Sequence, residues 1–323
     1  MYAKIIIHVI FAKCFSNTDW QYIYITSNSF LMKILKKGDN GDEVMFLQRL
    51  LLKTNLLTAA DGDFGSKTDA AVRQFQKDNS LSVDGEVGKN SWNALFAKAG
   101  TILGTDIYNG DETKSVTFYD DVEKNYWFCF CKSSEGGTVQ DARLGEHIDN
   151  LKARTILRGA YHFFRFSNPN TDVQIANFLD AAKKGGIIWS DKGILPPVLD
   201  VEPVPKEFDE PRKSQIIAER ANIITRTKKW LLAVEAKTGR TPIIYTTRLI
   251  WDEFLKSPKG FEKYPLWVAD YGGLAAPRMP STWAKDKYLM WQFSEKGKIG
   301  GNEGFDLNKL NVPLGDLLAM AGY

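Results

Sequence analysis

Cysteine and histidine are scarce in this chain, and their scarcity argues against several kinds of protein. Three cysteines among 323 residues are too few for a fold that is held together by disulfide bonds. The three histidines, His8, His147 and His162, have no spacing that is typical of a zinc site. We therefore expect no bound metal and no cofactor, and a metal-dependent amidase or peptidase is disfavoured.

The chain also lacks long apolar runs and a strong net charge. No segment reaches the ~20 apolar residues that a transmembrane helix needs. The formal charge of +3 is too small to favour nucleic acid as a partner, although it is compatible with an anionic polymer such as a cell wall. The length allows two domains, and we expect a monomer.

The first 31 residues carry an ambiguous signal. A short start, Met1–Lys4, precedes the apolar run 5–12, as in the n-region and h-region of a secretory signal. No clean Ala-x-Ala cleavage site follows, because Lys13 and Cys14 come next. Residues 1–31 are a marginal signal, a poorly ordered extension or the product of a misassigned start, and the export route stays open with these alternatives.

Residues 33–98 form a first domain with an internal repeat. The segment 61–68 aligns with 84–91, and each contains a glycine turn that leads into a helix. A further helix is predicted after the turn at 38–41, because apolar residues recur at helical spacing from Val44 onwards. The pattern predicts a small three-helix domain. Its glycines have structural explanations, so by themselves they indicate no ligand.

This first domain resembles the peptidoglycan-binding module of cell-wall hydrolases. The resemblance is carried by Gly38, Gly41, Val44, Leu47, Gln48 and Leu51, by Ala71, Val72, Phe75 and Gln76, and by Asp84, Gly85, Gly88, Ser91 and Trp92. It implies that bacterial peptidoglycan is the partner of this domain.

From Thr101 to Tyr323 the sequence changes to alternating strands and helices. Strands are predicted at 101–107, 126–131, 155–164, 194–201, 242–246, 265–270, 287–293 and 305–308, and helices at about 139–153, 171–184 and 212–237. This alternation predicts an α/β fold, a TIM-like (β/α) barrel. The later strands follow one another closely, so we expect reduced helices in the last third. Cys129 and Cys131, within an apolar strand, are predicted to be buried rather than reactive.

The tripeptide Asp200-Val201-Glu202 is the most informative motif. It ends the apolar run 194–199, and alternation along a strand places Asp200 and Glu202 on one face with their Cβ atoms roughly 6.5–7 Å apart. Burying two carboxylates is unfavourable unless they are used. Cleavage of a glycosidic bond uses such a pair. The plain alternative is a strand end that caps a helix or pairs with a basic residue.

Acids and aromatic residues recur at the other predicted strand ends, where barrel enzymes carry their chemistry. The candidates are Asp106, Tyr161, Phe163, Arg165, Tyr245, Tyr271, Trp291 and Asp306. Structural alternatives stand beside them. Asp306 could cap a turn, Arg165 could pair with an acid, Glu135 could be held by Lys132, and His162 and Trp267 could be core residues.

The second domain resembles the family 25 glycoside hydrolases over roughly residues 102–311. The resemblance is carried by Gly104-x-Asp106, Lys132-Ser-Ser-Glu135-Gly136, Tyr161-His162-Phe163, Leu199-Asp200-Val201-Glu202, Trp267-Val-Ala-Asp270-Tyr271, Trp291-Gln292-Phe293 and Asp306-Leu-Asn308. The sequence departs from the family pattern at three places. They are the two residues in the middle of Lys132–Glu135, the residues after Asp106, and an Asp/Lys-rich stretch at 111–124. None of them removes a carboxylate.

The resemblance implies a lysozyme that cleaves the β-1,4 bond between N-acetylmuramic acid and N-acetylglucosamine. It implies Glu202 as the general acid and Asp200 as its assistant, with Asp106 and Asp306 in the same pocket. It implies a substrate-binding surface formed by Tyr161, Phe163, Arg165, Tyr245, Tyr271 and Trp291. An endolysin or autolysin, acting outside the cell or in the wall or periplasm, is the expected role. The alternative is a catalytically silent wall-binding protein.

Overall fold

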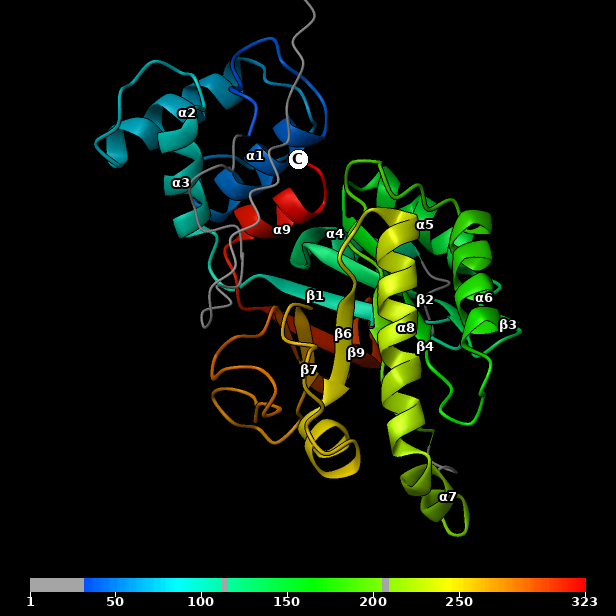
Figure 1. Ribbon diagram of the computed structural model, residues 1–323. Helices are drawn as coiled ribbons and strands as arrows, with labels where there is room; N and C mark the ends of the chain where they lie inside the picture. Colours follow the sequence, from blue (N-terminus) through cyan, green and yellow to red (C-terminus); the bar gives the residue numbers. More distant parts are fainter. Residues whose placement is uncertain (1–31, 112–115, 205–208) are drawn as a thin grey trace, which may run out of the picture.

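The computed structural model describes residues 32–111, 116–204 and 209–323, which form a helical domain and a β-barrel (Figure 1). The expectations for residues 1–31 lie outside these described residues. Among the described helices, none has the length and apolar character required to cross a membrane.

The helical domain contains α1 (Asp42–Lys53), α2 (Ser66–Asp78) and α3 (Lys89–Lys98), so the predicted three helices before the barrel are confirmed. A buried glutamine holds each repeated turn. Gln48 donates to the Asp61 carboxylate at 2.7 Å and to the Thr68 hydroxyl at 3.0 Å. The second repeat makes the same bonds with Gln76, Asp84 and Ser91. The internal repeat in the sequence therefore corresponds to two copies of one turn, each held by the same hydrogen bonds from a buried glutamine.

The barrel has eight strands: β1 (Leu103–Ile107), β2 (Phe128–Glu135), β4 (Leu157–Phe163), β5 (Val198–Asp200), β6 (Ile243–Thr247), β7 (Leu266–Ala269), β8 (Met290–Ile299) and β9 (Asn302–Leu310). Neighbours from β1 to β8 pair in parallel, and β9 closes the barrel by pairing antiparallel with β8 and β1. A short strand, β3 (Val139–Gln140), adds to the edge of β2. The predicted TIM-like barrel is confirmed, with one reversed strand.

Helices cover the first part of the barrel and become sparse in the last third, as predicted. They are α4 (Val116–Asn125), α5 (Leu144–Ala153), α6 (Thr171–Lys184), α7 (Arg212–Ala218) and α8 (Arg220–Thr238). Only a π-helical turn, η2 (Leu249–Phe254), follows β6, and the described chain has no helix between β7 and β9. The last helix, α9 (Leu314–Met320), returns to the helical domain (Figure 1). Helix α4 overlaps the stretch 111–124, for which the sequence analysis predicted no helix.

Alternation along the strands sends one set of side chains into the barrel. Asp106 on β1 lies directly opposite Asp306 on β9. Asp200 on β5 stands in register with Phe163 on β4 and with Tyr245 on β6. These neighbours lie toward the ends of the parallel strands, so the register brings residues that are far apart in the sequence to one end of the barrel.

The helical domain packs against the opposite end, where the parallel strands begin (Figure 1). Arg49 of α1 is 8% exposed, donates to the backbone oxygens of Glu123 and Tyr126, and lies over the Trp127 ring at 4.4 Å. The Tyr323 hydroxyl donates to Asp42 at 2.9 Å. A buried cation that satisfies two carbonyl groups is costly to expose, so the two domains form one packed body.

Candidate active site

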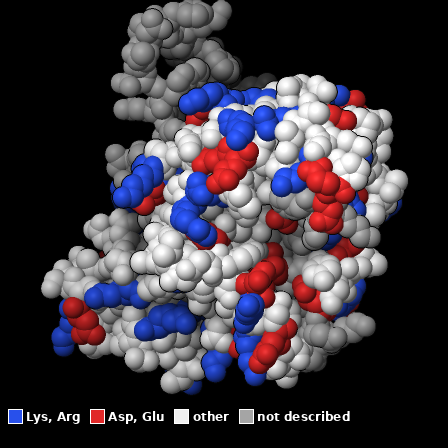
Figure 2. Space-filling view, turned by 90° about the horizontal axis from the view of Figure 1, so that it is seen from below, with Lys and Arg blue, Asp and Glu red and all other residues white. Residues whose placement is uncertain are grey.

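A cavity of about 230 Å³ opens at the carboxyl end of the parallel strands. It is lined by Asp106, Tyr108, Lys132, Tyr161, Phe163, Val198, Asp200, Glu202, Tyr245, Trp267, Gln292 and Asp306. Figure 2 shows the face toward which the head of β6 points in Figure 1, where acidic side chains gather near a central hollow and basic ones flank it. The four predicted catalytic carboxyls thus share one cavity.

Asp200 is the last residue of β5 and Glu202 follows two residues later, and the two acids lie on one side of the chain as strand alternation predicts. Both line the cavity, whereas Val201 between them is fully buried in the core outside the barrel. Burial raises the pKa of Glu202 to about 7, and the charge of Asp106 adds to the increase. Burial and the charge of Glu202 raise the pKa of Asp200 as well. Burial and their closeness therefore favour the protonated form of both carboxyls more than water would.

Asp106 and Asp306 form a second carboxyl pair across the strands β1 and β9. Asp106 Oδ1 accepts hydrogen bonds from Asn308 Nδ2 at 2.8 Å and from Gln292 Nε2 at 2.9 Å. Burial raises the pKa of Asp106 to about 6, and these donors limit the increase. Burial and the charge of Asp106 raise the pKa of Asp306 to about 9. The hydrogen bond between the two carboxyls lowers the pKa of Asp106 and raises that of Asp306, so Asp306 is the member that holds the proton and donates it to Asp106.

Two tyrosines set the direction in which Gln292 points. The hydroxyl of Tyr245 donates to Gln292 Oε1 at 2.7 Å, and that of Tyr271 donates to the same atom. The side-chain oxygen is thus occupied, and the amide N–H group must face Asp106. Trp267 orients Asn308 in the same way, because its indole N–H donates to Asn308 Oδ1 at 2.8 Å. The structure therefore fixes both amide donors toward one carboxylate.

The predicted substrate-binding residues separate into two groups. Tyr161, Phe163 and Tyr245 line the cavity, and Tyr271, which is 44% exposed, stands beside Gln292 at its mouth. Trp291 does not line it. Gln292 points into the barrel, so its neighbour on the strand points out, and the Trp291 indole is buried against the backbone oxygen of Asp270.

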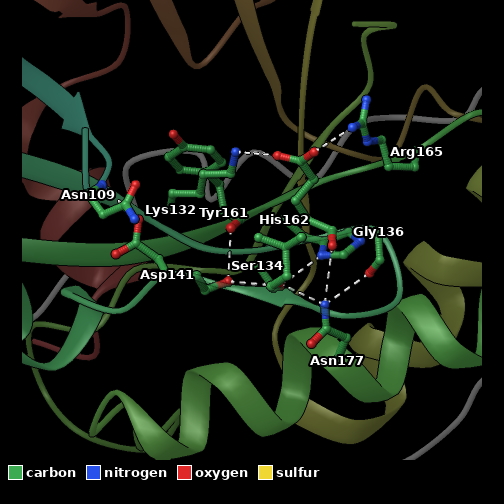
Figure 3. Close-up of polar contacts among 12 residues, drawn as sticks. Asn109, Lys132, Ser134, Gly136, Asp141, Tyr161, His162, Arg165 and Asn177 are labelled. Atoms are coloured by element: carbon green, nitrogen blue, oxygen red, sulfur yellow. Dashed lines mark hydrogen bonds and ion pairs between the residues drawn. The ribbon is translucent and has the colours of Figure 1, made fainter. Parts of the chain in front are cut away.

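Arg165 also lies away from the cavity. Its guanidinium pairs with Glu135 at 2.9 Å, which is the pairing with an acid that the sequence left open, and its role in substrate binding stays a prediction. Glu135 pairs in turn with Lys132 at 2.6 Å, and Figure 3 shows Lys132 and Arg165 approaching from opposite sides. His162 is a buried core residue between Ser134 and Gln174, as the structural alternative had it, whereas Trp267 is 2% exposed and also lines the cavity.

Comparison with known protein families identifies both domains. The model of the glycosyl hydrolases family 25 matches residues 105–302. The chain belongs to family 25. A model of a peptidoglycan binding domain matches residues 40–95, so this family 25 chain carries a peptidoglycan-binding domain before its barrel.

Three relatives illustrate how the family 25 barrel is shared. Lysozyme M1 of Streptomyces globisporus is 34% identical over 60% of this chain, and the match spans 63% of that protein's length. The uncharacterized protein YegX of Escherichia coli K12 is 31% identical over 68% of this chain and 73% of its own. The solved bacterial lysozyme from Streptomyces coelicolor is 29% identical, with a TM-score of 0.58 over 68% of this chain and 96% of its own.

Five residues that line the family 25 cavity are absent from the sequence-based list of site residues, namely Tyr108, Lys132, Val198, Trp267 and Gln292, and so is Asn308, which contacts Asp106. Lys132 contributes an ammonium group to the lining, and its charge lowers the pKa of Asp200 and of Glu202 against the effect of burial. Gln292 and Asn308 hold Asp106. Their positions were detectable, because Asn308 is two residues from Asp306 on one strand and therefore shares its face.

Proposed function

We propose that this protein is a lysozyme that hydrolyses the β-1,4 bond between N-acetylmuramic acid and N-acetylglucosamine in peptidoglycan. The observation that carries the proposal is the pair Asp200 and Glu202, which line the same open cavity and have raised pKa values. Membership of family 25 and the peptidoglycan-binding domain support the choice of polymer.

Glu202 acts as the general acid. Asp200, the last residue of β5, is buried, whereas Glu202, which follows the strand, is half-buried, so Glu202 is the one that reaches a bound glycan. A pKa of about 7 keeps a large share of Glu202 protonated at neutral pH, and this proton can pass to the glycosidic oxygen as the bond breaks.

Asp200 assists at the sugar carbon that becomes positively charged. Its side chain is 6% exposed, and its buried Oδ1 has no hydrogen-bond partner among the described residues. The Asp200 carboxyl also lines the cavity, where it can accept the N–H of a substrate acetamide or face an oxocarbenium-like centre. The positive charge of Lys132 favours the ionised form of Asp200.

Asp106 and Asp306 support the reaction from across the cavity. The charge on Asp106, held by two amide donors, raises the pKa of Glu202 and so favours the proton donor. The rings of Tyr161, Phe163, Tyr245 and Tyr271 offer faces and hydroxyls to the sugars. The helical domain would hold the enzyme on its insoluble substrate and raise the local glycan concentration. We place this activity in the wall, as expected of an endolysin or autolysin.

Digestion of purified peptidoglycan by the wild type and by Glu202→Gln, with mass spectrometry of the released fragments, tests the proposal. Fragments with reducing muramic acid ends, absent with the variant, are expected. Reducing glucosamine ends would show that the other bond is cut, and free peptides would show a different chemistry. Intact wall binding without any release would establish the catalytically silent binding protein instead.

A further inference from the structure

A second depression adjoins the catalytic cavity. A groove of about 410 Å³ lies between residues 135–139, which form the turn from β2 to β3, and residues 165 and 167–169, which follow β4. Arg165 and Glu135 line it, and the rest of the lining is mostly glycine and small polar side chains. The groove is therefore polar, and it is more than a gap between mobile loops, because α6 fixes both of its walls.

One wall is held by Asn177, a buried residue of α6. Its amide nitrogen donates to the backbone oxygens of Gly136 at 3.0 Å and of Val139 at 2.9 Å (Figure 3). The other wall is held by Gln174, which is fully buried. It accepts from the Arg165 amide at 3.0 Å and donates to the backbone oxygen of Asn168 at 3.3 Å. A groove whose walls are fixed in this way loses little entropy when a ligand binds.

A chain of three charges connects this groove to the catalytic cavity. Lys132 lines the cavity and Arg165 lines the groove. Glu135 lies between them and forms an ion pair with each. Two cations against one carboxylate leave a net charge of +1. Arg165 is the most exposed member, with 33% of its side chain accessible against 18% for each of the others. Figure 3 shows one guanidinium nitrogen turned away from the ion pair, which leaves donors for an anion.

We propose that this groove binds the stem peptide of the muramic acid residue in the cavity, with Arg165 pairing to a peptide carboxylate. The inference rests on the proposed lysozyme activity. A stem peptide leaves the sugar through its lactyl group and carries carboxylates along its length. Two extended residues span roughly 7 Å, a reach comparable to a chain of two ion pairs. Peptide-bearing glycan would thus contact both depressions, and bare glycan would contact only the cavity.

The test compares kcat/KM of the wild type and Arg165→Gln on two soluble substrates. One is uncross-linked peptidoglycan with its peptides, and the other is the same glycan after an amidase has removed them. Loss of a charge-assisted pair predicts a fall of about ten- to a hundredfold for the variant on the peptide-bearing glycan. The rate on bare glycan should match that of the wild type, which also shows that the variant is folded.

A matched control and two contrary outcomes complete the design. Arg248→Gln removes an exposed arginine that also pairs with a glutamate, Glu253, outside the groove, and should leave both rates unchanged. Equal losses for Arg165→Gln on both substrates, or none on either, would overturn the proposal. A loss that persists on peptidoglycan with amidated carboxylates would overturn the role of a carboxylate. A wild type that cleaves neither substrate would refute the lysozyme assignment itself.

Discussion

The two carboxyl pairs of the cavity are built in different ways. Asp200 and Glu202 follow one another on one strand end, and a buried oxygen of Asp200 has no hydrogen-bond partner in the described part of the chain. Asp106 and Asp306 face one another across two strands, and Asp106 accepts from two oriented amides. Burial raises the pKa in both pairs, but only the second is held in place by neighbouring donors.

This difference separates a reacting pair from a supporting one. A carboxylate that is saturated by amide donors has its charge and position fixed, so it acts as a constant part of the electrostatic field. A carboxyl without such donors must change partner or protonation state when substrate arrives. We therefore assign the chemistry to Asp200 and Glu202, and the following changes test that division.

Replacing Glu202 should have the largest effect. Glu202→Gln keeps the size of the side chain but cannot donate an acidic proton, so we expect the rate to fall by about a hundredfold to ten-thousandfold. The thermal midpoint should not decrease, because an uncharged amide replaces a buried acid. Initial rates and thermal unfolding of the same preparations check both expectations. A variant with near wild-type rates would remove Glu202 from the reaction.

Replacing Asp106 should have a smaller effect with a different signature. Asp106→Asn removes the charge that raises the pKa of Glu202, so that pKa should fall and the alkaline limb of the pH–rate profile should move to lower pH. We also expect a rate loss of about tenfold, because the donors on Gln292 and Asn308 lose their charged acceptor. A full pH–rate profile of the variant measures both the shift of the alkaline limb and the loss of rate. Abolished activity at every pH would place Asp106 in the reacting pair.

Replacing Lys132 should move the profile in the opposite direction. The Lys132 charge lowers the pKa of Asp200 and of Glu202. Lys132→Met should therefore raise both pKa values and shift both limbs of the profile upward, by on the order of one pH unit. Glu135→Gln is the matched control, because it removes a negative charge and should shift the profile downward. If neither limb of the pH–rate profile moves in Lys132→Met, the role of Lys132 is purely structural.

Much of this site was predictable from the sequence, because strand alternation is a strong local rule. It placed Asp200 and Glu202 on one face, and chain order placed Asp106 and Asp306 at the same rim. The same rule could not tell which face points inward on β8, and Trp291 was chosen where Gln292 is the inward residue. Nor could it show that Arg165 lines the neighbouring groove and not the cavity, because its partner, Glu135, comes from another strand.

The fold shows the same division between local and non-local information. The prediction of an α/β barrel with few late helices was correct, but strand lengths were not. Pro196 and Pro197 lack backbone N–H groups, so β5 begins only at Val198, later than its apolar run. The hairpin of β8 and β9 extends to Ile299 and Asn302. This part of the hairpin contains exposed polar residues, so a search for apolar runs did not predict it as strand.

The smallest expected effect concerns stability and the supporting pair. The pKa of Asp306 is raised to about 9 by burial and by the charge of Asp106. The stabilisation that its protonated form provides is complete below about pH 4 and is lost as the pH rises toward 9. Asp306→Asn keeps an N–H donor toward Asp106 but cannot ionise. We therefore expect equal stability near pH 4 and a gain on the order of 1 kcal/mol at pH 8, roughly 2 °C in Tm.

Thermal unfolding at the two pH values measures this difference, with Asp149→Asn on the exposed face of α5 as the control. That control should leave the unfolding midpoint unchanged, because Asp149 is exposed and lies outside the carboxyl pair. A pH-independent effect of Asp306→Asn would mean that Asp306 is ionised in the native state. The pair would then carry two charges, the hydrogen bond between its members would be absent, and the contrast between a fixed and a reacting carboxyl pair would no longer hold.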